Sequence, residues 1–514
     1  MESRKDQKNI DKNLKLIVKS SFVVFIGLLI SKILTYIYRI IIARSFGPEV
    51  YGLFSISIMI LGWFMLFASL GFSDGLIRYL ALFRGKKQYN KIKHIFKITV
   101  FINLITGVLC SIFLFFLAEF ISINIFHNSN LTLFLKIFSF IVPIYLFANI
   151  FLSVLQAFEK IQWYSFIINI LQNAVNVFAL IIFLLIGLKS EAIIFSYFLG
   201  IVSMLVVSYF IVKYKTPSIF GESYLIEKEK KEIKKEFISY SWPLMFMGIT
   251  ANLFFWADSF FIGYFKGVSA VGFYNAAIPI AFLLMFIPEI FLKLFFPLIT
   301  KEYSKGKSEL VKQLSQQVGK WIFILNLPLF LIMFLFPGVI INFLFGPQYL
   351  VAANALKILS VGAFFYSLVW IHNNLLSMIG KSKILFINIV GVSILNIFLD
   401  IFLIPKYGLN GAAISTTISK TILAGILFIE VKYSLKVVPF RRKIIPIFII
   451  SLIPVTITLI LRKFVQINIF SLILIGLLFI LIYILLIILT KSLDKNDLMI
   501  LSNIKNKIFN YNHL

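Results

Sequence analysis

Cysteine, histidine and acidic residues are scarce in this sequence, and each scarcity argues against a class of chemistry. The single cysteine, Cys110, lies in an apolar run, cannot form an intramolecular disulfide, and is expected to be a small buried hydrophobe. The four histidines stand far apart without cysteine partners, which argues against a metal site. Only 14% of the residues are charged, whereas about a quarter are charged in soluble domains. The chain is therefore not a soluble enzyme.

Nucleotide-binding motifs are missing as well. The segments Gly306-Lys-Ser308 and Gly380-Lys-Ser382 resemble the end of a Walker loop, but Lys301 and Leu375 occupy the position of its first glycine. Neither segment predicts a nucleotide site, and we expect no cofactor. Any uphill work must then be driven by an ion gradient, by the membrane potential or by the substrate's own gradient.

Apolar residues, in contrast, make up 60% of the chain and fall into long runs. A helix needs about 20 such residues to cross the roughly 30 Å of hydrocarbon in a bilayer. Dividing the runs at glycine, proline and charge clusters predicts fourteen transmembrane helices. The sequence therefore predicts an all-α, polytopic membrane protein with little room for a soluble domain.

The excess of basic residues fits the same topology. The chain has 49 Lys and Arg against 21 Asp and Glu, a balance that would indicate nucleic acid in a soluble protein. Here the basic residues gather in alternate loops, which is the positive-inside pattern of a membrane protein with both termini in the cytoplasm. We therefore expect a multi-pass protein of the plasma (inner) membrane, with no nucleic-acid partner and no cleaved signal peptide.

A repeat emerges when the chain is compared with itself. Gly47 and Gly52 recur as Gly267 and Gly272, with the same offset for both. The pattern predicts two parallel six-helix repeats, which form two bundles around a central cavity and can rock to expose a substrate path. The last two helices lie outside the repeat. Further pairs, which share an offset one residue longer, are Gly85 and Gly306, Lys136 and Lys357, Lys160 and Lys381, and Gly187 and Gly408.

These features divide the chain into six parts. The linker between the bundles alternates Lys and Glu from 227 to 236, which is typical of a solvated amphipathic helix with internal ion pairs; a dedicated partner site is the alternative. In order, the parts are a cytoplasmic N-terminus, the first bundle, the cytoplasmic linker, the second bundle, two extra transmembrane helices and a cytoplasmic tail, at residues 1–19, 20–213, 214–236, 237–432, 444–490 and 491–514.

Several ionisable side chains lie inside predicted spans, where charge is costly and usually functional. Lys32 lies near mid-bilayer, and Arg39 follows seven residues later on the same helix face. They form an inward cationic stripe, unless a partner neutralises Lys32 and Arg39 snorkels outward. Lys420 lies near the middle of the twelfth span. Asp258 in the seventh span is a counter-charge to the cations or a proton or sodium ligand, with a structural ion pair and ion coupling about equally favoured.

Amide side chains form a second pattern. Polar groups at helical spacing often join neighbouring helices through hydrogen bonds, and a wall that contacts sugar hydroxyls is the alternative interpretation. The amides are Asn149 and Gln156 on one face of the fourth span, and Asn169, Gln172, Asn173 and Asn176 on one face of the fifth.

The most telling motif is Ala-Arg-Ser-Phe-Gly-Pro-Glu-Val-Tyr-Gly-Leu-Phe-Ser, from Ala43 to Ser55. Further motifs are Gly71-Phe-Ser-Asp-Gly75 and Pro405-Lys-Tyr-Gly-Leu-Asn-Gly-Ala-Ala413. Together they resemble oligosaccharide flippases of the polysaccharide-synthesis type. These belong to the superfamily that also holds multidrug and toxin extruders and the lipid II flippases, and the resemblance covers nearly the whole chain.

The resemblance implies that the protein flips a lipid-diphosphate-linked oligosaccharide to the outer leaflet by alternating access, for cell-surface polysaccharide or glycan synthesis. Lys32 matches a first-helix cation of the lipid II flippases, whereas their second cation falls on Tyr38, beside Arg39. We therefore expect Lys32 and Arg39, helped by Lys420, to bind the diphosphate. The expected partners are this substrate, membrane lipids and other glycan-synthesis proteins, and we expect a monomer.

Two other classes of protein fit the sequence less well. A glycan polymerase or glycosyltransferase normally needs a sizeable outer loop, and the longest predicted one, Ala118 to Asn130, is short, so we expect no enzyme. A multidrug or ion antiporter of the same superfamily is the main alternative. It would favour an acidic cavity, whereas the deep charges predicted here are mostly basic.

Overall fold

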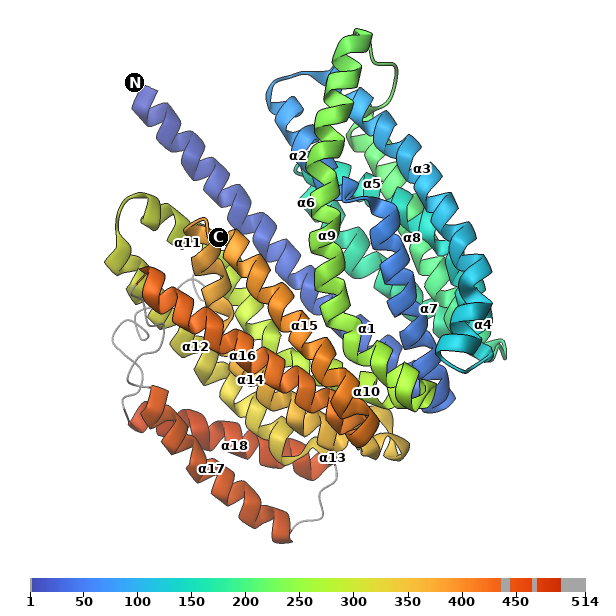
Figure 1. Cartoon of the computed structure of the whole chain (residues 1–514). Coiled ribbons are helices and arrows are strands. Elements are labelled where there is room, and N and C mark those ends of the chain that lie inside the picture. The colour runs from blue at the N-terminus through green and yellow to red at the C-terminus, as the bar shows by residue number, and fades with distance from the viewer. Residues whose placement is uncertain (1, 436–443, 465–468, 491–514) are drawn as a thin grey trace. The chain divides into compact units, whose positions relative to one another are not determined.

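The computed structural model describes residues 2–435, 444–464 and 469–490, which form helices and no strand (Figure 1). The prediction of an all-α protein is confirmed over these ranges, and the predicted tail at 491–514 lies outside them. The α-helices are α1 (Glu2–Ser69), α2 (Phe72–Gly85), α3 (Tyr89–Phe120), α4 (Asn130–Ser139), α5 (Ile141–Ala157), α6 (Ile161–Ser165), α7 (Gln172–Leu185), α8 (Glu191–Lys215), α9 (Glu227–Lys266), α10 (Val268–Ala281), α11 (Phe286–Ser304), α12 (Ser308–Leu335), α13 (Pro337–Phe345), α14 (Ala353–Met378), α15 (Ser382–Tyr407), α16 (Leu409–Leu435), α17 (Ile444–Phe464) and α18 (Ile469–Leu489).

Twelve of the described helical segments are long and apolar enough to cross a membrane. One of them, Phe25–Ser69, has 45 residues, about twice the length that one crossing needs. Its backbone breaks at Gly47, where φ is 79° and ψ is −178°, so two spans meet at this glycine. A further apolar helix, Ile473–Leu489, is shorter. The protein is thus a multi-pass membrane protein, while the count of fourteen stays a prediction.

The helix boundaries repeat along the chain as the sequence pattern predicts. When the segment Ile161–Leu185 is moved forward by the offset that relates Lys160 to Lys381, it falls on α15. With the same offset, α4 and α5 fall on α14. Gly267 has φ 82° and ψ 175°, nearly the conformation of Gly47. Both glycines therefore have a combination of φ and ψ that only glycine adopts readily. The sequence repeat is therefore a structural repeat as well.

The fold forms two compact units, which are described separately. Unit 1 contains residues 1–276 and 389–415, and unit 2 contains residues 277–388 and 416–514. A buried apolar cluster in unit 1 joins α2, α3, α5, α8 and the first turns of α9. In unit 2, α12 packs against α14, and the two extra helices, α17 and α18, pack together and against α12. The bundle boundaries given above stay predictions.

Small residues bring α2 against α9 within unit 1. A Cβ on Gly75 would lie 2.0 Å from the Ser241 hydroxyl oxygen and 3.1 Å from the Phe237 ring, so a larger residue would force these side chains to shift. The Arg78 guanidinium lies 4.0 Å from the centre of the Tyr240 ring, which is a cation–π contact. The motif that begins at Gly71 therefore has a packing role at this contact.

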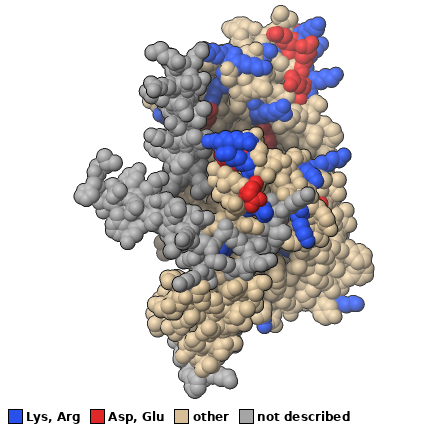
Figure 2. All heavy atoms as spheres, turned by 90° about the vertical axis from the view of Figure 1, so that its left-hand side faces the viewer, with Lys and Arg blue, Asp and Glu red and all other residues tan. Residues whose placement is uncertain are grey.

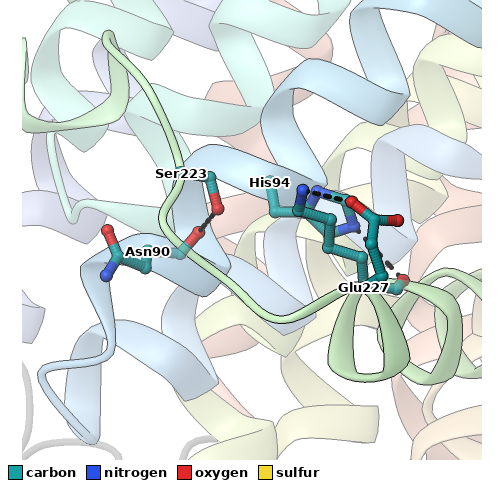
Figure 3. A network of polar contacts seen from close by, with 5 residues as sticks. Asn90, His94, Ser223 and Glu227 are labelled. Carbon is teal, nitrogen blue, oxygen red and sulfur yellow. Dashed lines mark hydrogen bonds and ion pairs between the residues drawn. The ribbon is translucent and has the colours of Figure 1, made fainter.

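The linker between the repeats folds back on α3 (Figure 3). Ser223 Oγ donates to the Asn90 carbonyl oxygen at 2.9 Å, and His94 Nε2 lies 3.2 Å from the carbonyl oxygen of Lys230. Lys230 and Glu227 form an ion pair of 2.7 Å one turn apart. The linker thus contains an internal ion pair, as predicted, and it also docks on the first turns of α3.

Large apolar side chains cover much of the described surface. Phe116, Leu185 and Phe470 expose 76%, 82% and 77% of their area. On the face that Figure 2 shows, charged side chains gather in the upper part, and broad areas carry neither blue nor red atoms. An exposed apolar surface of this extent marks contact with lipid.

Candidate functional site

Lys32 and Arg39 lie on one face of α1, in unit 1. Lys32 is exposed, and Arg39 is half-buried. The Arg39 guanidinium lies within hydrogen-bonding reach of the Tyr51 hydroxyl, and the hydroxyls of Tyr36 and Tyr197 lie within its electrostatic reach. Arg39 therefore faces other parts of unit 1, and this geometry favours the inward stripe over an outward, snorkelling Arg39.

Asn173 joins α7 to α1 through both ends of its amide. Its Oδ1 accepts a hydrogen bond from Thr35 Oγ1 at 3.1 Å, and its Nδ2 donates to Ser31 Oγ at 3.2 Å. These two contacts flank Lys32 along α1. The helix-joining interpretation of this amide is therefore supported, because a side-chain amide has few further hydrogen bonds to offer a sugar.

The other amides of this span have different surroundings. Asn169 is buried within a π-helical segment, Phe166–Leu171 (η2), and such segments often occur at functional sites. The carbonyl oxygens around the Asn176 amide determine which of its two ends is the nitrogen. This nitrogen donates to the carbonyl oxygens of Ser196 and Gln172 at 3.3 Å. Asn176 thus joins α7 to α8.

The exposure of the predicted amides differs along the two spans. Gln156 at the end of α5 is exposed, whereas Asn149 on the same helix is half-buried. The four amides between Asn169 and Asn176 are half-buried or buried. The sugar-contacting wall stays a prediction, and Gln156 is its most accessible member.

Two carboxyl groups lie together inside unit 1. Asp258 on α9 exposes 6% of its area, and Asp400 on α15 exposes none. The Tyr274 hydroxyl donates to Asp258 Oδ2 at 2.5 Å, and the two carboxyl groups are within hydrogen-bonding reach of each other. Ser415 lies beside Asp400 and accepts a hydrogen bond from Asn396 Nδ2 at 2.9 Å.

The closeness of these carboxyl groups decides what they can do. Two carboxylates in a low-dielectric interior repel each other strongly, so the pair is stable only with a shared proton or a bound cation. The closeness of Asp400 supports a proton or cation ligand as one role of Asp258. The counter-charge role of Asp258 stays a prediction as well.

Lys420, the third predicted cation, belongs to unit 2. Its Nζ lies 3.4 Å from the centre of the Phe282 ring, and the residue exposes only 8% of its area. An aromatic face stabilises a desolvated ammonium. A second lysine of the same unit, Lys320 on α12, is fully buried and was not singled out from the sequence, because it lies near the start of a predicted span.

Sequence reasoning also missed Asp400, although a signal for it was present. Asp400 stands in a long apolar run, with Asn396 one turn before it. The reasoning that selected Asp258, a lone acid inside a span, applies equally to Asp400. Tyr51 was noted only as part of the motif from Ala43 to Ser55, so its contact with Arg39 could not be foreseen.

The sequence is similar to known membrane proteins. Residues 17–302 match the family described as polysaccharide biosynthesis protein, and residues 243–402 match the MatE family. An uncharacterized membrane protein of Methanocaldococcus jannaschii is 28% identical over 403 residues, covering 74% of this chain and 77% of that protein. A Shigella flexneri protein named for O-antigen transport is 25% identical over 383 residues, covering 73% of this chain and 88% of that protein.

The fold is similar to a solved structure. The lipid II flippase MurJ in an inward closed conformation matches with a TM-score of 0.72 and 19% sequence identity, over 92% of this chain and 99% of that one. At this identity the likeness shows a shared fold. The family match, in contrast, covers more than half of the chain. The chain therefore belongs to the polysaccharide biosynthesis protein family.

Proposed function

We propose that this protein translocates a lipid-diphosphate-linked oligosaccharide from the cytoplasmic to the outer leaflet of the plasma membrane. The similarity to a protein named for O-antigen transport supports transport rather than catalysis. The observation that supports an anionic substrate is the position of Arg39. Its half-buried guanidinium lies among tyrosine hydroxyls, on the helix face that also holds Lys32. A guanidinium binds two phosphate oxygens at once, and an ammonium adds a point charge. An anionic headgroup fits such side chains.

The remaining parts of the substrate need further contacts. Lys420 in unit 2 is proposed as a third cation for the diphosphate. Gln156 is proposed as a sugar contact, since its side chain is exposed on α5. The product of this transport would serve cell-surface polysaccharide or glycan synthesis, with the termini of the chain in the cytoplasm.

Energy coupling is proposed to use Asp258 and Asp400. The sequence contains no nucleotide-binding motif, so an ion gradient, the membrane potential or the substrate's own gradient must supply any driving force. A buried carboxyl pair exchanges a proton or a small cation as the protein alternates between its two states. An inside-negative potential is worth about 2.3 kcal/mol per charge per 100 mV, and it drives an anionic headgroup outward.

The test is a flipping assay in proteoliposomes. The probe is a polyprenyl diphosphate that carries a short, fluorescently labelled oligosaccharide, and its arrival in the outer leaflet is read by a membrane-impermeant quencher. Lys32→Ala and Arg39→Ala are expected to abolish flipping. Lys189→Ala, an exposed loop residue of unit 1, is the matched control and should flip normally. Normal flipping by both Lys32→Ala and Arg39→Ala would contradict the proposed diphosphate site.

An antiporter of organic cations is the second candidate function. It is favoured by one observation, namely that the MatE match at 243–402 contains both Asp258 and Asp400. The same proteoliposomes distinguish the two functions. Gradient-driven uptake of a fluorescent organic cation, without flipping of the diphosphate probe, would identify an antiporter.

A further inference from the structure

A chain of buried contacts in unit 1 joins Arg39 to the carboxyl pair. We propose that Tyr51 and Asn275 are positioning residues that couple the state of Asp258 and Asp400 to the orientation of Arg39. This inference rests on the proposed function, because it assigns a connection between the proposed headgroup site and the proposed coupling site.

The first link runs from Arg39 to α10. Tyr51 is fully buried; its hydroxyl donates to the Asn275 carbonyl oxygen at 3.1 Å, and the Arg39 guanidinium lies within hydrogen-bonding reach of the same hydroxyl. A helical carbonyl normally accepts from the N–H four residues later, but that residue is Pro279, which has no N–H. The proline therefore frees the Asn275 carbonyl, and Tyr51 satisfies it.

The second link runs from α10 to α9. The Asn275 amide donates to Ser259 Oγ at 3.1 Å, and the preceding residue, Tyr274, donates to the Asp258 carboxylate. Two consecutive residues of α10 thus hold two consecutive residues of α9. Ser259 is fully buried and Asn275 exposes only 2% of its area, so water does not compete with these contacts.

The links explain how the carboxyl pair acts on Arg39 at a distance. Binding or release of a proton or cation at Asp258 changes the strength of the Tyr274 hydrogen bond. Because Tyr274 and Asn275 are adjacent, a shift of the first moves the carbonyl of the second. Tyr51 follows that carbonyl and carries the Arg39 guanidinium with it. Neither Tyr51 nor Asn275 needs to touch the substrate.

The experiment measures the response of flipping to a gradient. Initial rates for the diphosphate probe are compared with and without a tenfold gradient of sodium or of protons, in separate arms. The readout is the ratio of the two rates within one protein, so a general loss of activity cancels. Wild type is expected to have a ratio well above one, and Tyr51→Phe, which loses only the hydroxyl, is expected to bring it close to one.

Tyr38→Phe is the matched control. The Tyr38 hydroxyl is also buried in unit 1, but it bonds Ser196 Oγ at 2.9 Å, outside the proposed connection. This variant should keep the wild-type ratio. Pro279→Ala is a second test, because the restored N–H competes with Tyr51 for the Asn275 carbonyl while the helix gains stability. It should also lower the ratio.

The outcomes separate the two proposals. A ratio of one in wild type, in both gradient arms, removes the coupling function and with it the role of Tyr51. A ratio above one in wild type that is unchanged in Tyr51→Phe and in Pro279→Ala overturns the inferred connection alone. A lowered ratio in these two variants, with a wild-type ratio in Tyr38→Phe, supports it.

Discussion

Gly52 and Gly272 hold equivalent positions in the two repeats, and each lies against the backbone of the other repeat within unit 1. A Cβ on Gly52 would be 2.0 Å from the Val268 carbonyl oxygen, and one on Gly272 would be 1.9 Å from the Pro48 carbonyl oxygen. Pro48 and Val268 are themselves equivalent, so the contact is reciprocal, as between two copies related by a two-fold axis. These four residues are called the glycine seam below.

Gly272→Ala is expected to open the glycine seam. The new methyl group cannot fit against a backbone oxygen, so α10 must move away from α1, at a cost of about 1–3 kcal/mol for an overpacked contact. The measurement is the thermal unfolding temperature of the purified protein in detergent, which should fall. Gly391→Ala on α15 is the control, because a Cβ there meets no atom within 4 Å. Equal unfolding temperatures for both variants would contradict the prediction.

Asn173→Ala and Gln156→Ala are expected to have opposite effects. Loss of the Asn173 amide leaves Ser31 and Thr35 without their partner, which should lower stability by about 1 kcal/mol and change substrate affinity little. Gln156 is exposed, so its loss should leave stability within about 0.5 kcal/mol and weaken binding of the probe. Thermal unfolding and the half-saturating probe concentration measure the two effects. The prediction is wrong if Asn173→Ala weakens binding at unchanged stability.

Asp400→Asn is expected to stabilise the protein while it abolishes the response to an ion gradient. The substitution keeps the shape of the side chain and removes the need for a shared proton or a bound cation, so the thermal unfolding temperature at pH 8 should rise by a few degrees, equivalent to about 1 kcal/mol. The same variant should show equal flipping rates with and without a gradient. A lower unfolding temperature would show that Asp400 is needed as a charge for folding.

Single cysteines should reveal the topology after Cys110 has been changed to serine. Asn128 Nδ2 donates to Glu49 Oε1 at 3.1 Å, so these two loops lie at one end of unit 1. Cysteine at either position should react with an impermeant maleimide on intact cells. Cysteine at Glu222, in the exposed part of the linker, should react only after permeabilisation. Labelling of the Glu222 position in intact cells would reverse the predicted orientation.

The fold was predictable because its signals are periodic and numerous. Long apolar runs mark the helices, and the pairing of Gly47 with Gly267 marks the repeat. The nearly equal backbone angles of these two glycines show why the pairing held, since no other residue type adopts the conformation without strain. A backbone conformation that only glycine adopts can therefore be recognised from the sequence, because the glycine recurs at the same position of each repeat.

The contacts of the candidate site were less predictable, for a physical reason. Lys32, Arg39 and Asp258 stand out because a charge inside an apolar run is costly wherever its partners lie. The residues that contact them have no comparable signal in the sequence. Tyr51 and Asn275 are ordinary residues in apolar runs, and they belong to different repeats. Their roles depend on a three-dimensional approach between distant parts of the chain, which single-sequence periodicity does not contain.

The docking of the linker on α3 has a consequence for biosynthesis. The hydrogen bond between Ser223 and the Asn90 carbonyl closes a loop of 133 residues that includes most of the first repeat. Ser223 leaves the ribosome after the sixth helix of that repeat and before any helix of the second. Both residues of this contact are therefore synthesised before any helix of the second repeat, and the linker can dock on α3 without the second half of the chain.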